Sequence, residues 1–316
     1  MRHSFPLQIS ILILIMVSGC TLQGGEVANY GIVVEEFVAE PSEVQSDEPF
    51  VVKAMIRNTG KVKAENIFVE LFNTGLGEYS EIRCDPSFLE IGGCQNPFDL
   101  SGEDRERGLH GESKICKWEC IAPFLKKGSL VTYNPSIRIY YSYITNAIKP
   151  VFIGSQDEVI KLQSEGETLS SQPSSVTEGP VSLDVIVKGP RRFWEESQTI
   201  EFPIEIDVRN IGGGVACLSG EGGYAEGCDN TGNWNKVVLR SNAAGITFKE
   251  CDLDVEEAVI DLWENRGQIV CEAELQVPPH ARNIQKNIEI TAVYEYFIDK
   301  SVSVVVKGTE EYDQNF

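Results

Sequence analysis

The sequence is poor in the residues that carry most catalytic chemistry. It has three histidines, His3, His110 and His280, and nothing near His110 or His280 marks a nucleophile that a histidine base would activate. It contains no Gly-x-Ser-x-Gly elbow, no phosphate-binding loop and no His-Glu-x-x-His zinc motif. These absences argue against the common enzyme classes. We predict a protein with no catalytic residue, no cofactor and no metal site.

Positive charge and long apolar runs are also scarce. Lys and Arg total 27 against 48 Asp and Glu, a net charge of -21 that is spread along the chain. Such a surface repels nucleic acid, which we exclude as a partner. Beyond the first twenty residues no apolar run approaches the roughly 20 residues of a membrane-spanning helix. No Asn-x-Ser/Thr sequence with a non-proline middle residue occurs, so N-glycosylation is not predicted.

The first residues have the pattern of an export signal. Arg2 and His3 precede an apolar stretch from Phe5 to Val17 that is too short to span a membrane. The segment ends in Val17-Ser18-Gly19-Cys20, which resembles the lipobox of prokaryotic lipoproteins. The resemblance implies a signal peptide over residues 1–19 and a diacylglycerol anchor on Cys20, followed by a tether over 20–28. The alternative is an ordinary secretory signal, and either reading predicts an exported protein at the cell surface or in the periplasm.

Apart from Cys20, the cysteines fall into two sets of four. An even number in each half of an exported chain favours two disulfides per half. The alternative is a zinc ion held by four thiolates in each half, but no Cys-x-x-Cys pair occurs. The eight residues are Cys84, Cys94, Cys116, Cys120, Cys217, Cys228, Cys251 and Cys271.

Apolar residues alternate with polar ones in both halves, which is typical of half-buried strands. The clearest runs are 50–56 and 202–208, and each ends in a turn sequence, Arg57-Asn58-Thr59-Gly60 and Arg209-Asn210-Ile211-Gly212. Residues 154–180 are rich in Ser, Gly and Glu and predict a linker, with about two helical turns over 157–165. The sequence predicts no other helix.

The two halves also match each other in the order of their strands, cysteines and prolines, which indicates an internal duplication. Aligning Cys84 with Cys251 and Cys116 with Cys271 predicts a shared bridge, Cys84–Cys116 in one half and Cys251–Cys271 in the other. Elimination then pairs Cys94 with Cys120 and Cys217 with Cys228. Trp118 lies between Cys116 and Cys120 on one strand face, so we expect it in the core.

These features predict an all-β chain with two tandem antiparallel β-sandwich domains of immunoglobulin-like type, each with two disulfides. Domain 1 covers 29–153, the linker 154–180, domain 2 181–308 and a tail 309–316. The run from Val52 to Leu71 resembles the CARDB type of immunoglobulin-like module, which is found in prokaryotic surface and adhesion proteins. The resemblance rests on turn and core residues, so it implies a fold and a setting and carries over no functional residue.

The most unusual loop runs from Gly220 to Asn235, with its base closed by Cys217 and Cys228. Aromatic rings among amides and glycines suit contact with a sugar or a protein. We take Tyr224, Asn230, Asn233 and Trp234 as candidate partner-binding residues, the alternative being that Trp234 packs at the start of a strand.

An acidic cluster follows Cys251. If this run is a strand, alternation places Asp252 and Asp254 on one face, where they would bind Ca²⁺ or form a solvated edge.

The sequence thus predicts a non-catalytic binding, adhesion or structural protein, attached to the membrane through lipid at Cys20 and contacting an unknown protein or glycan partner. The first alternative is a binding component of an export, pilus or envelope-assembly complex. The second is a hydrolase of envelope polymers that uses carboxylates, because two acids at the required separation can come from any strands. Since only about ten residues separate Cys20 from the first strand, domain 1 is expected near the membrane and domain 2 further out.

Overall fold

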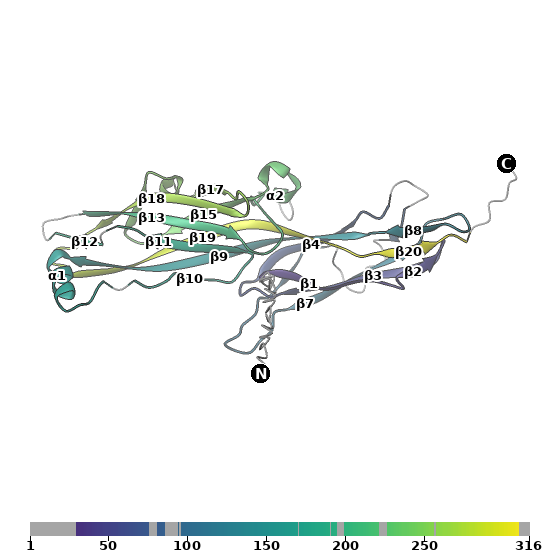
Figure 1. The fold of residues 1–316 in the computed structure, drawn as a ribbon, viewed down its shortest axis with the longest axis horizontal. Coiled ribbons are helices and arrows are strands. Elements are labelled where there is room, and N and C mark those ends of the chain that lie inside the picture. Colours follow the sequence, from purple (N-terminus) through teal and green to yellow (C-terminus); the bar gives the residue numbers. More distant parts are fainter. Residues whose placement is uncertain are drawn as a thin grey trace, which may run out of the picture.

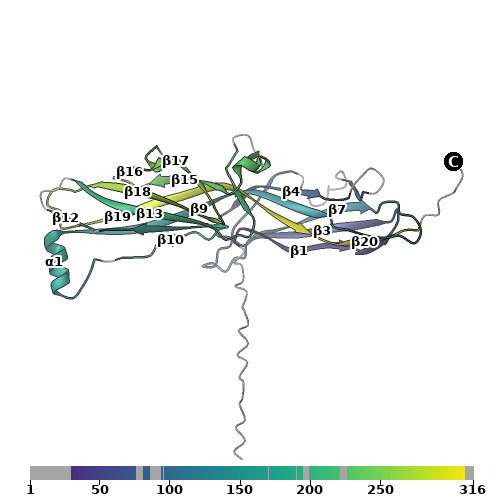
Figure 2. The ribbon, with the colours of Figure 1, turned by 45° about the horizontal axis from the view of Figure 1, so that its top comes forward.

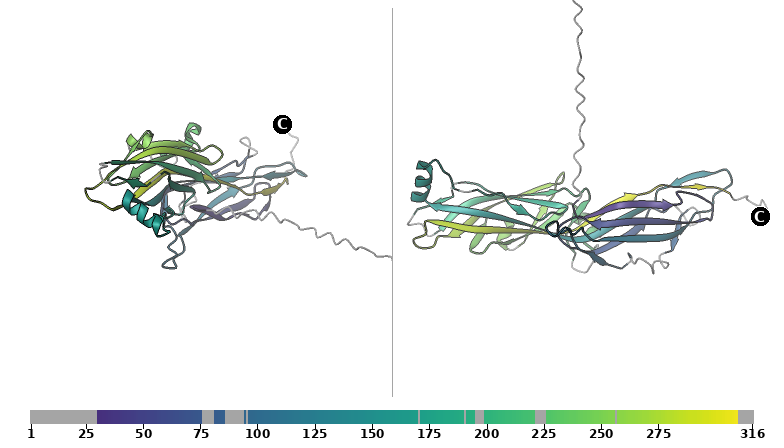
Figure 3. Two further views of the ribbon diagram at one scale, coloured as in Figure 1. Left: turned by 60° about the vertical axis from the view of Figure 1, so that its left-hand side comes forward. Right: turned by 90° about the horizontal axis from the view of Figure 1, so that it is seen from below.

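The structure is a computed structural model of the whole chain. It describes residues 30–75, 81–85, 94, 96–169, 171–189, 191–194, 199–220, 226–255 and 257–309. The predicted signal peptide, Cys20, Tyr224 and nearly all of the predicted tail lie outside these residues. Nearly all the regular structure is β, as predicted, and the strands form an elongated molecule with a lobe on each side of a narrow waist (Figures 1 and 3).

Two four-stranded sheets form the outer layers, one in each lobe, and they have the same strand order. The outer sheet of lobe 1 contains, in spatial order, β1 (Ile32–Glu40), β3 (Pro49–Asn58), β7 (Ser113–Ile121) and β5 (Arg83–Asp85). The outer sheet of lobe 2 contains β11 (Val181–Val187), β13 (Thr199–Asn210), β18 (Arg266–Gln276) and β16 (Ile246–Lys249).

One long sheet forms the second layer of both lobes. Its order is β17 (Glu257–Asp261), β15 (Lys236–Asn242), β19 (Asn283–Ser301), β9 (Ser136–Ser155), β4 (Ala64–Phe72) and β6 (Phe98–Leu100). Three short strands pair with its two central strands: β10 (Ser175–Val176) and β12 (Arg192–Phe193) with β9, and β14 (Val215–Cys217) with β19.

The remaining elements are small and lie at the ends of the lobes or beside the waist. A three-stranded sheet at the far end of lobe 1 contains β2 (Glu43–Gln45), β20 (Val304–Lys307) and β8 (Leu130–Tyr133). The predicted helical turns form α1 (Gln156–Ser164) at the opposite end of the molecule. The other short helical segments are α2 (Glu226–Asp229), η2 (Thr231–Asn233) and η3 (Asp252–Val255).

The two central strands run through both lobes and join them. Antiparallel pairing between β9 and β19 is continuous from Ser136↔Ser301 to Gly154↔Asn283. Each strand therefore begins in one lobe and ends in the other (Figure 2). The boundaries predicted at 153 and 181 do not separate two closed sheets, because the end of β9 belongs to lobe 2 and the end of β19 belongs to lobe 1. The segment predicted as a linker instead returns along the sheet, where β10 pairs with β9.

The predicted duplication corresponds to a pseudo-twofold axis through the centre of this pair. In the central sheet, β9 is the counterpart of β19 and β4 is the counterpart of β15. The order β15-β19-β9-β4 is therefore symmetric about the β9–β19 pair. Four tyrosines surround the axis, with Tyr141 paired to Tyr296 and Tyr143 to Tyr294, and ring centroids of 5.5 and 6.2 Å within the pairs. All four side chains are nearly fully buried, so the waist is part of the core.

The matching turn sequences make matching contacts beside the waist. The Asn58 side chain accepts from the Gly60 N–H at 3.0 Å and donates to the Val62 carbonyl at 2.8 Å. Asn210 does the same with Gly212 at 3.3 Å and Gly214 at 2.8 Å. The hydroxyls of Tyr143 and Tyr296 then accept from the N–H groups of Val62 and Gly214, so each turn is held by one asparagine and one tyrosine.

The first described residues also lie at the waist. The Thr59 N–H donates to the Gly31 carbonyl at 2.8 Å, and Gly31 lies against Tyr141 and Pro180. The chain thus enters between the lobes, which extend to either side of the entry point (Figure 2). The shared sheet holds both lobes beside this point, and the order of the domains relative to the membrane stays a prediction.

Disulfide pairing differs from the prediction in the first half only. Cys217–Cys228 and Cys251–Cys271 are present as predicted, whereas lobe 1 contains Cys84–Cys120 and Cys94–Cys116. The alignment of the halves was wrong by two residues along β7. Val52 and Ile204 each lie six residues before the turn asparagine, and their strand partners are Trp118 and Cys271. Trp118 thus occupies the position of Cys271, and a shift of two residues leaves every side chain on the same face.

The tyrosine cluster makes stability sensitive to alkali. Burial raises the pKa of Tyr143 and Tyr296 to about 12, and it raises the pKa of Tyr141 and Tyr294 well above its ordinary value. An unfolded phenol ionises near pH 10, so the folded state retains these protons longer and stability falls as pH rises from about 10 to 12. We expect phenolate absorbance to appear in two phases, the later one together with the loss of near-ultraviolet circular dichroism. Ionisation of all ten tyrosines in an intact fold would contradict this assignment.

Candidate functional site: a groove between two strand edges

The predicted binding loop packs against the waist of the molecule. The Trp234 indole is half-buried on Phe297, with ring centroids 5.2 Å apart, and its N–H donates to the Cys228 carbonyl at 2.7 Å. Asn230 accepts from the Gly232 N–H at 2.9 Å and begins η2, and the Asn233 carbonyl accepts from the Leu218 N–H. The structure therefore brings Asn230, Asn233 and Trp234 together in roles that stabilise the loop. Their binding role stays a prediction.

The buried carboxylate of Glu295 holds the same loop through two hydrogen bonds. Glu295 lies opposite Ser142 on the pseudo-twofold axis and is only 2 % exposed. Its two oxygens accept from the N–H groups of Gly220 at 3.1 Å and Gly227 at 3.0 Å. Burial raises the pKa of Glu295, while the backbone donors oppose that rise. The sequence analysis did not identify this residue, because nothing local distinguishes it from the many exposed glutamates.

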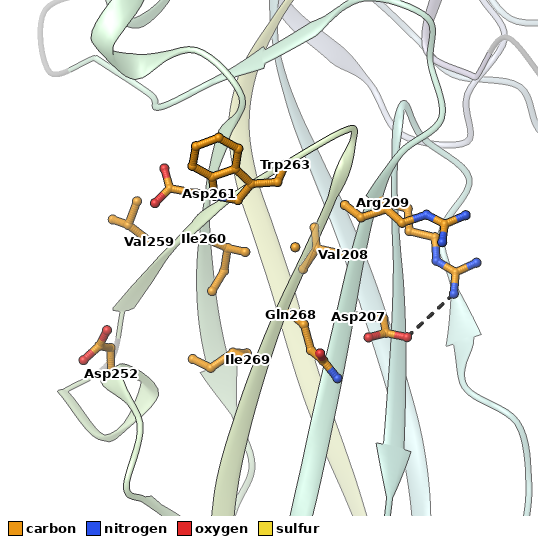
Figure 4. A pocket seen from close by; sticks show the side chains of 12 residues that line it. Asp207, Val208, Arg209, Asp252, Val259, Ile260, Asp261, Trp263, Gln268 and Ile269 are labelled. Carbon is orange, nitrogen blue, oxygen red and sulfur yellow. Dashed lines mark ion pairs between the residues drawn. The ribbon is translucent and has the colours of Figure 1, made fainter.

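A groove of about 650 Å³ opens on lobe 2 between β17 and β18 (Figure 4). These two strands belong to different sheets and are joined by a short hairpin that carries Trp263. The side chains of Ile260 and Ile269 lie between the strands, and Trp263 lies at one end. The strands approach closely at Gly267, where an added Cβ would lie 2.5 Å from Ile260 and 2.7 Å from the Asp261 carbonyl.

The groove exists because the chain leaves one sheet and enters the other. β16 pairs with residues 272–275 of β18 and then ends. Glu250 adopts a φ of 58°, Cys251 is bonded to Cys271, and η3 carries the chain across to β17 in the central sheet. The strand expected at Asp252 and Asp254 is therefore wrong, since these residues belong to a 3₁₀ turn. Asp252 is exposed at the lower end of the groove (Figure 4).

The crossing leaves two strand edges without a neighbouring strand in the described part of the chain. β17 is the last strand of the central sheet. Arg266 is bridged to Trp263 in the hairpin, and no described strand pairs with residues 267–270 of β18 on the side away from β13. Backbone groups alternate in direction along a strand. The Asn210 N–H of β13 donates to the Asn265 carbonyl, so the backbone groups of residues 267 and 269 also face β13. The backbone groups of Gln268 and Val270 therefore face the open edge.

The opposite edge follows the same rule. The Leu262 N–H donates to the Asn235 carbonyl of the neighbouring segment, so Ile260 and Ala258 also direct their backbone groups toward β15. Val259 and Asp261 direct theirs away from β15. Each side of the groove thus has two residues whose backbone donors and acceptors lie along an open edge.

Large apolar side chains are exposed around these edges. Trp263 is 82 % exposed, Val270 55 % and Val259 52 %. Edge strands are usually protected by charges, prolines or bulges, because an open apolar edge invites pairing with another chain. The concentration of exposed apolar side chains here marks the groove as a contact surface.

The charged residues of the groove have both signs. Asp207, Asp252 and Asp261 line it together with Arg209 and Arg266. Asp207 and Asp261 have weak ion pairs with Arg209 at 3.6 Å and Lys236 at 3.7 Å. The groove thus combines an apolar floor with three carboxylates and two guanidinium groups at its margins.

Other candidate chemistry is dispersed. Within the described ranges, no three His, Cys, Asp or Glu side chains converge as a metal site. His110 and His280 are exposed in loops of different lobes. No helix in the described residues is long and apolar enough to cross a membrane.

A second groove, on lobe 1, is lined by Phe68, Leu71 and Trp118. Its lining includes Thr74, Glu81 and Cys84, which adjoin in sequence the residues outside the described part of the chain. The lobe 2 groove is therefore the candidate site. Trp263 is not among the residues predicted from the sequence, although a tryptophan beside the Glu264-Asn265 turn is a local signal of an exposed hairpin tip.

Comparisons with known proteins give no family. No family model matches the sequence, and no curated protein matches it. Among solved structures, the CupB6 tip adhesin from Pseudomonas aeruginosa has 9 % identity and a TM-score of 0.17, covering 89 % of this chain and 96 % of that chain.

Two other adhesins are similarly distant. The Enterococcus faecalis MSCRAMM ACE has 9 % identity and a TM-score of 0.15, with 88 % and 95 % covered. The collagen adhesin CNA from S. aureus has 7 % identity and a TM-score of 0.11, with 87 % and 92 % covered. Likenesses at these scores carry no argument about function.

The two tryptophans should respond differently to truncation. Trp234→Ala removes a half-buried ring and its hydrogen bond, so we expect a loss of about 2 kcal/mol or more in the free energy of unfolding. Trp263→Ala removes a ring that is 82 % exposed and should change it by less than about 0.5 kcal/mol. Denaturant unfolding of the oxidised protein measures both. Equal losses would show that the two environments are misassigned.

Proposed function

We propose that this protein is a non-catalytic binding protein of the cell surface or periplasm, attached to the membrane by lipid at Cys20, that holds a partner in the lobe 2 groove. The observation that carries the proposal is the exposed Trp263 at the end of a groove flanked by open strand edges. A structural tryptophan would be covered, whereas binding sites concentrate aromatic side chains on their surface. An adhesin and a binding component of an export, pilus or envelope-assembly complex would differ only in the partner that the groove binds.

The disulfides support the proposed location. Four bridges are typical of proteins that fold in an oxidising compartment outside the cytoplasm. Two acyl chains suffice for stable attachment without a spanning helix.

Partner capture tests the groove. The full-length protein is crosslinked in cells and isolated with its bound material, in parallel with Trp263→Ala and Trp194→Ala. Trp194 is the matched control, since it is 64 % exposed but lies at the far end of lobe 2 beside β12. We expect Trp263→Ala to lower recovery of the partner at least tenfold, while Trp194→Ala recovers it as the wild type does.

Two outcomes would contradict this function. Equal recovery with both variants would exclude the groove as the binding site. Turnover of an envelope polysaccharide that is abolished by Asp252→Asn or Asp261→Asn would favour the carboxylate hydrolase instead.

The anchor is tested separately. Cys20→Ser removes the thiol that would carry diacylglycerol, so we expect loss of labelling by a radioactive fatty acid and release of the protein from the membrane fraction. The double variant Cys94→Ser, Cys116→Ser is the control, because it removes two cysteines that form a disulfide and leaves Cys20 unchanged. Persistent labelling of the Cys20→Ser protein would exclude this lipidation site.

A further inference from the structure

We infer that the occupant of the lobe 2 groove is an extended segment of a partner polypeptide, which adds as a strand to the open edge of β18 and carries apolar residues alternating with basic ones. This inference rests on the proposed function and names the chemical class of the partner.

The first reason is the backbone of β18. Gln268 and Val270 each direct an N–H and a C=O into the space that the chain leaves when it crosses at Cys251. β16 fills the same position further along, opposite residues 272–275. A strand that continues the line of β16 would pair with residues 267–270, a length of about 14 Å. Only a polypeptide presents donors and acceptors at that repeat.

The second reason is the shape of the groove. An added strand alternates its side chains between the two faces of the sheet. Its inward side chains would contact Ile260 and Ile269, and its outward ones would lie beside Gln268 and Val270. The floor thus selects apolar residues at every second position.

The third reason is charge. The charged residues that line the groove are Asp207, Asp252, Asp261, Arg209 and Arg266, so acid is in slight excess there, and the whole chain carries a net charge of -21. Basic residues in the segment would be attracted to this surface, and acidic ones repelled. The same net charge opposes a second copy of this chain as the occupant.

Synthetic peptides test the inference directly with the full-length oxidised protein. The probe is a labelled peptide of alternating lysine and valine, seven residues long, with blocked ends. Controls are a peptide of the same composition with its valines in one block, and a peptide with glutamate in place of lysine. We expect binding of the alternating probe, measured by fluorescence anisotropy, to be at least tenfold tighter than that of either control.

Backbone methylation then separates strand addition from other contacts. One series methylates the odd amide nitrogens of the probe and the other the even ones, which leaves the side chains unchanged. A strand paired through one edge uses one set of N–H groups, so one series should lose at least tenfold in affinity while the other binds within about threefold of the parent.

Variants of β18 supply the reciprocal test. Val270→Pro removes an N–H directed toward the open edge and leaves the β13 ladder intact, so it should weaken the parent probe at least tenfold. Val270→Ala keeps that N–H and should weaken it less than threefold. The thermal transition and the four disulfides check that each variant is folded. If Val270→Pro does not fold, the two methylated series still decide the question.

Four results would overturn the inference. Equal effects of the two methylated series, or no binding of the parent probe at about 1 mM, would exclude strand addition. If partner capture depends on Trp263 but no peptide binds, the proposed function stands and the partner in the groove is a glycan. A concentration-dependent dimer that Val270→Pro abolishes would show that the groove holds a second copy. If recovery of the partner does not depend on Trp263, the proposed function itself is wrong.

Discussion

Continuous pairing between β9 and β19 is the constraint on which the rest of the structure depends. A ladder that extends from Ser136↔Ser301 to Gly154↔Asn283 fixes the register of both strands, and with it the positions of the two outer sheets. A shift by one residue would turn the buried tyrosines of the waist to the opposite face. The two halves of the chain therefore form one body, although each half has the strand order of a separate sandwich.

The polar groups at the waist are consistent with that role. Asn58 is fully buried and satisfied by contacts with Gly60, Val62 and Leu100, and Asn210 occupies the equivalent place. Buried polar groups with complete hydrogen bonding specify one arrangement, because any other leaves them unpaired. The buried carboxylate of Glu295 also specifies one arrangement, because it binds backbone N–H groups of the Cys217–Cys228 loop. Its counterpart in the first half is Ser142, which faces no such loop. The duplication has thus been modified where the Cys217–Cys228 loop was added.

The groove is a consequence of the same sandwich architecture. A chain that changes sheets at Cys251 must leave one strand edge open, and the Cys251–Cys271 bridge fixes the point of departure. Gly267 allows the two edges to approach within a few ångströms, so the opening is narrow and has an apolar floor. Exposed apolar residues at such an edge carry a risk of aggregation, which the high negative charge of the chain reduces.

The sequence by itself determined the strand class, the core faces, the longer helix near 157–165 and the equivalence of the two halves, but not the four-residue helix α2. These features depend on alternation and local turns, which short segments encode completely, as the buried positions of β3 and β13 show. Only the tertiary structure decided that the halves share a sheet, that Cys84 pairs with Cys120, and that Trp234 packs while Trp263 is exposed. Each of these depends on which distant segments become neighbours. A period of two gives the face of a residue but neither its partner strand nor, when the shift is two residues, its register.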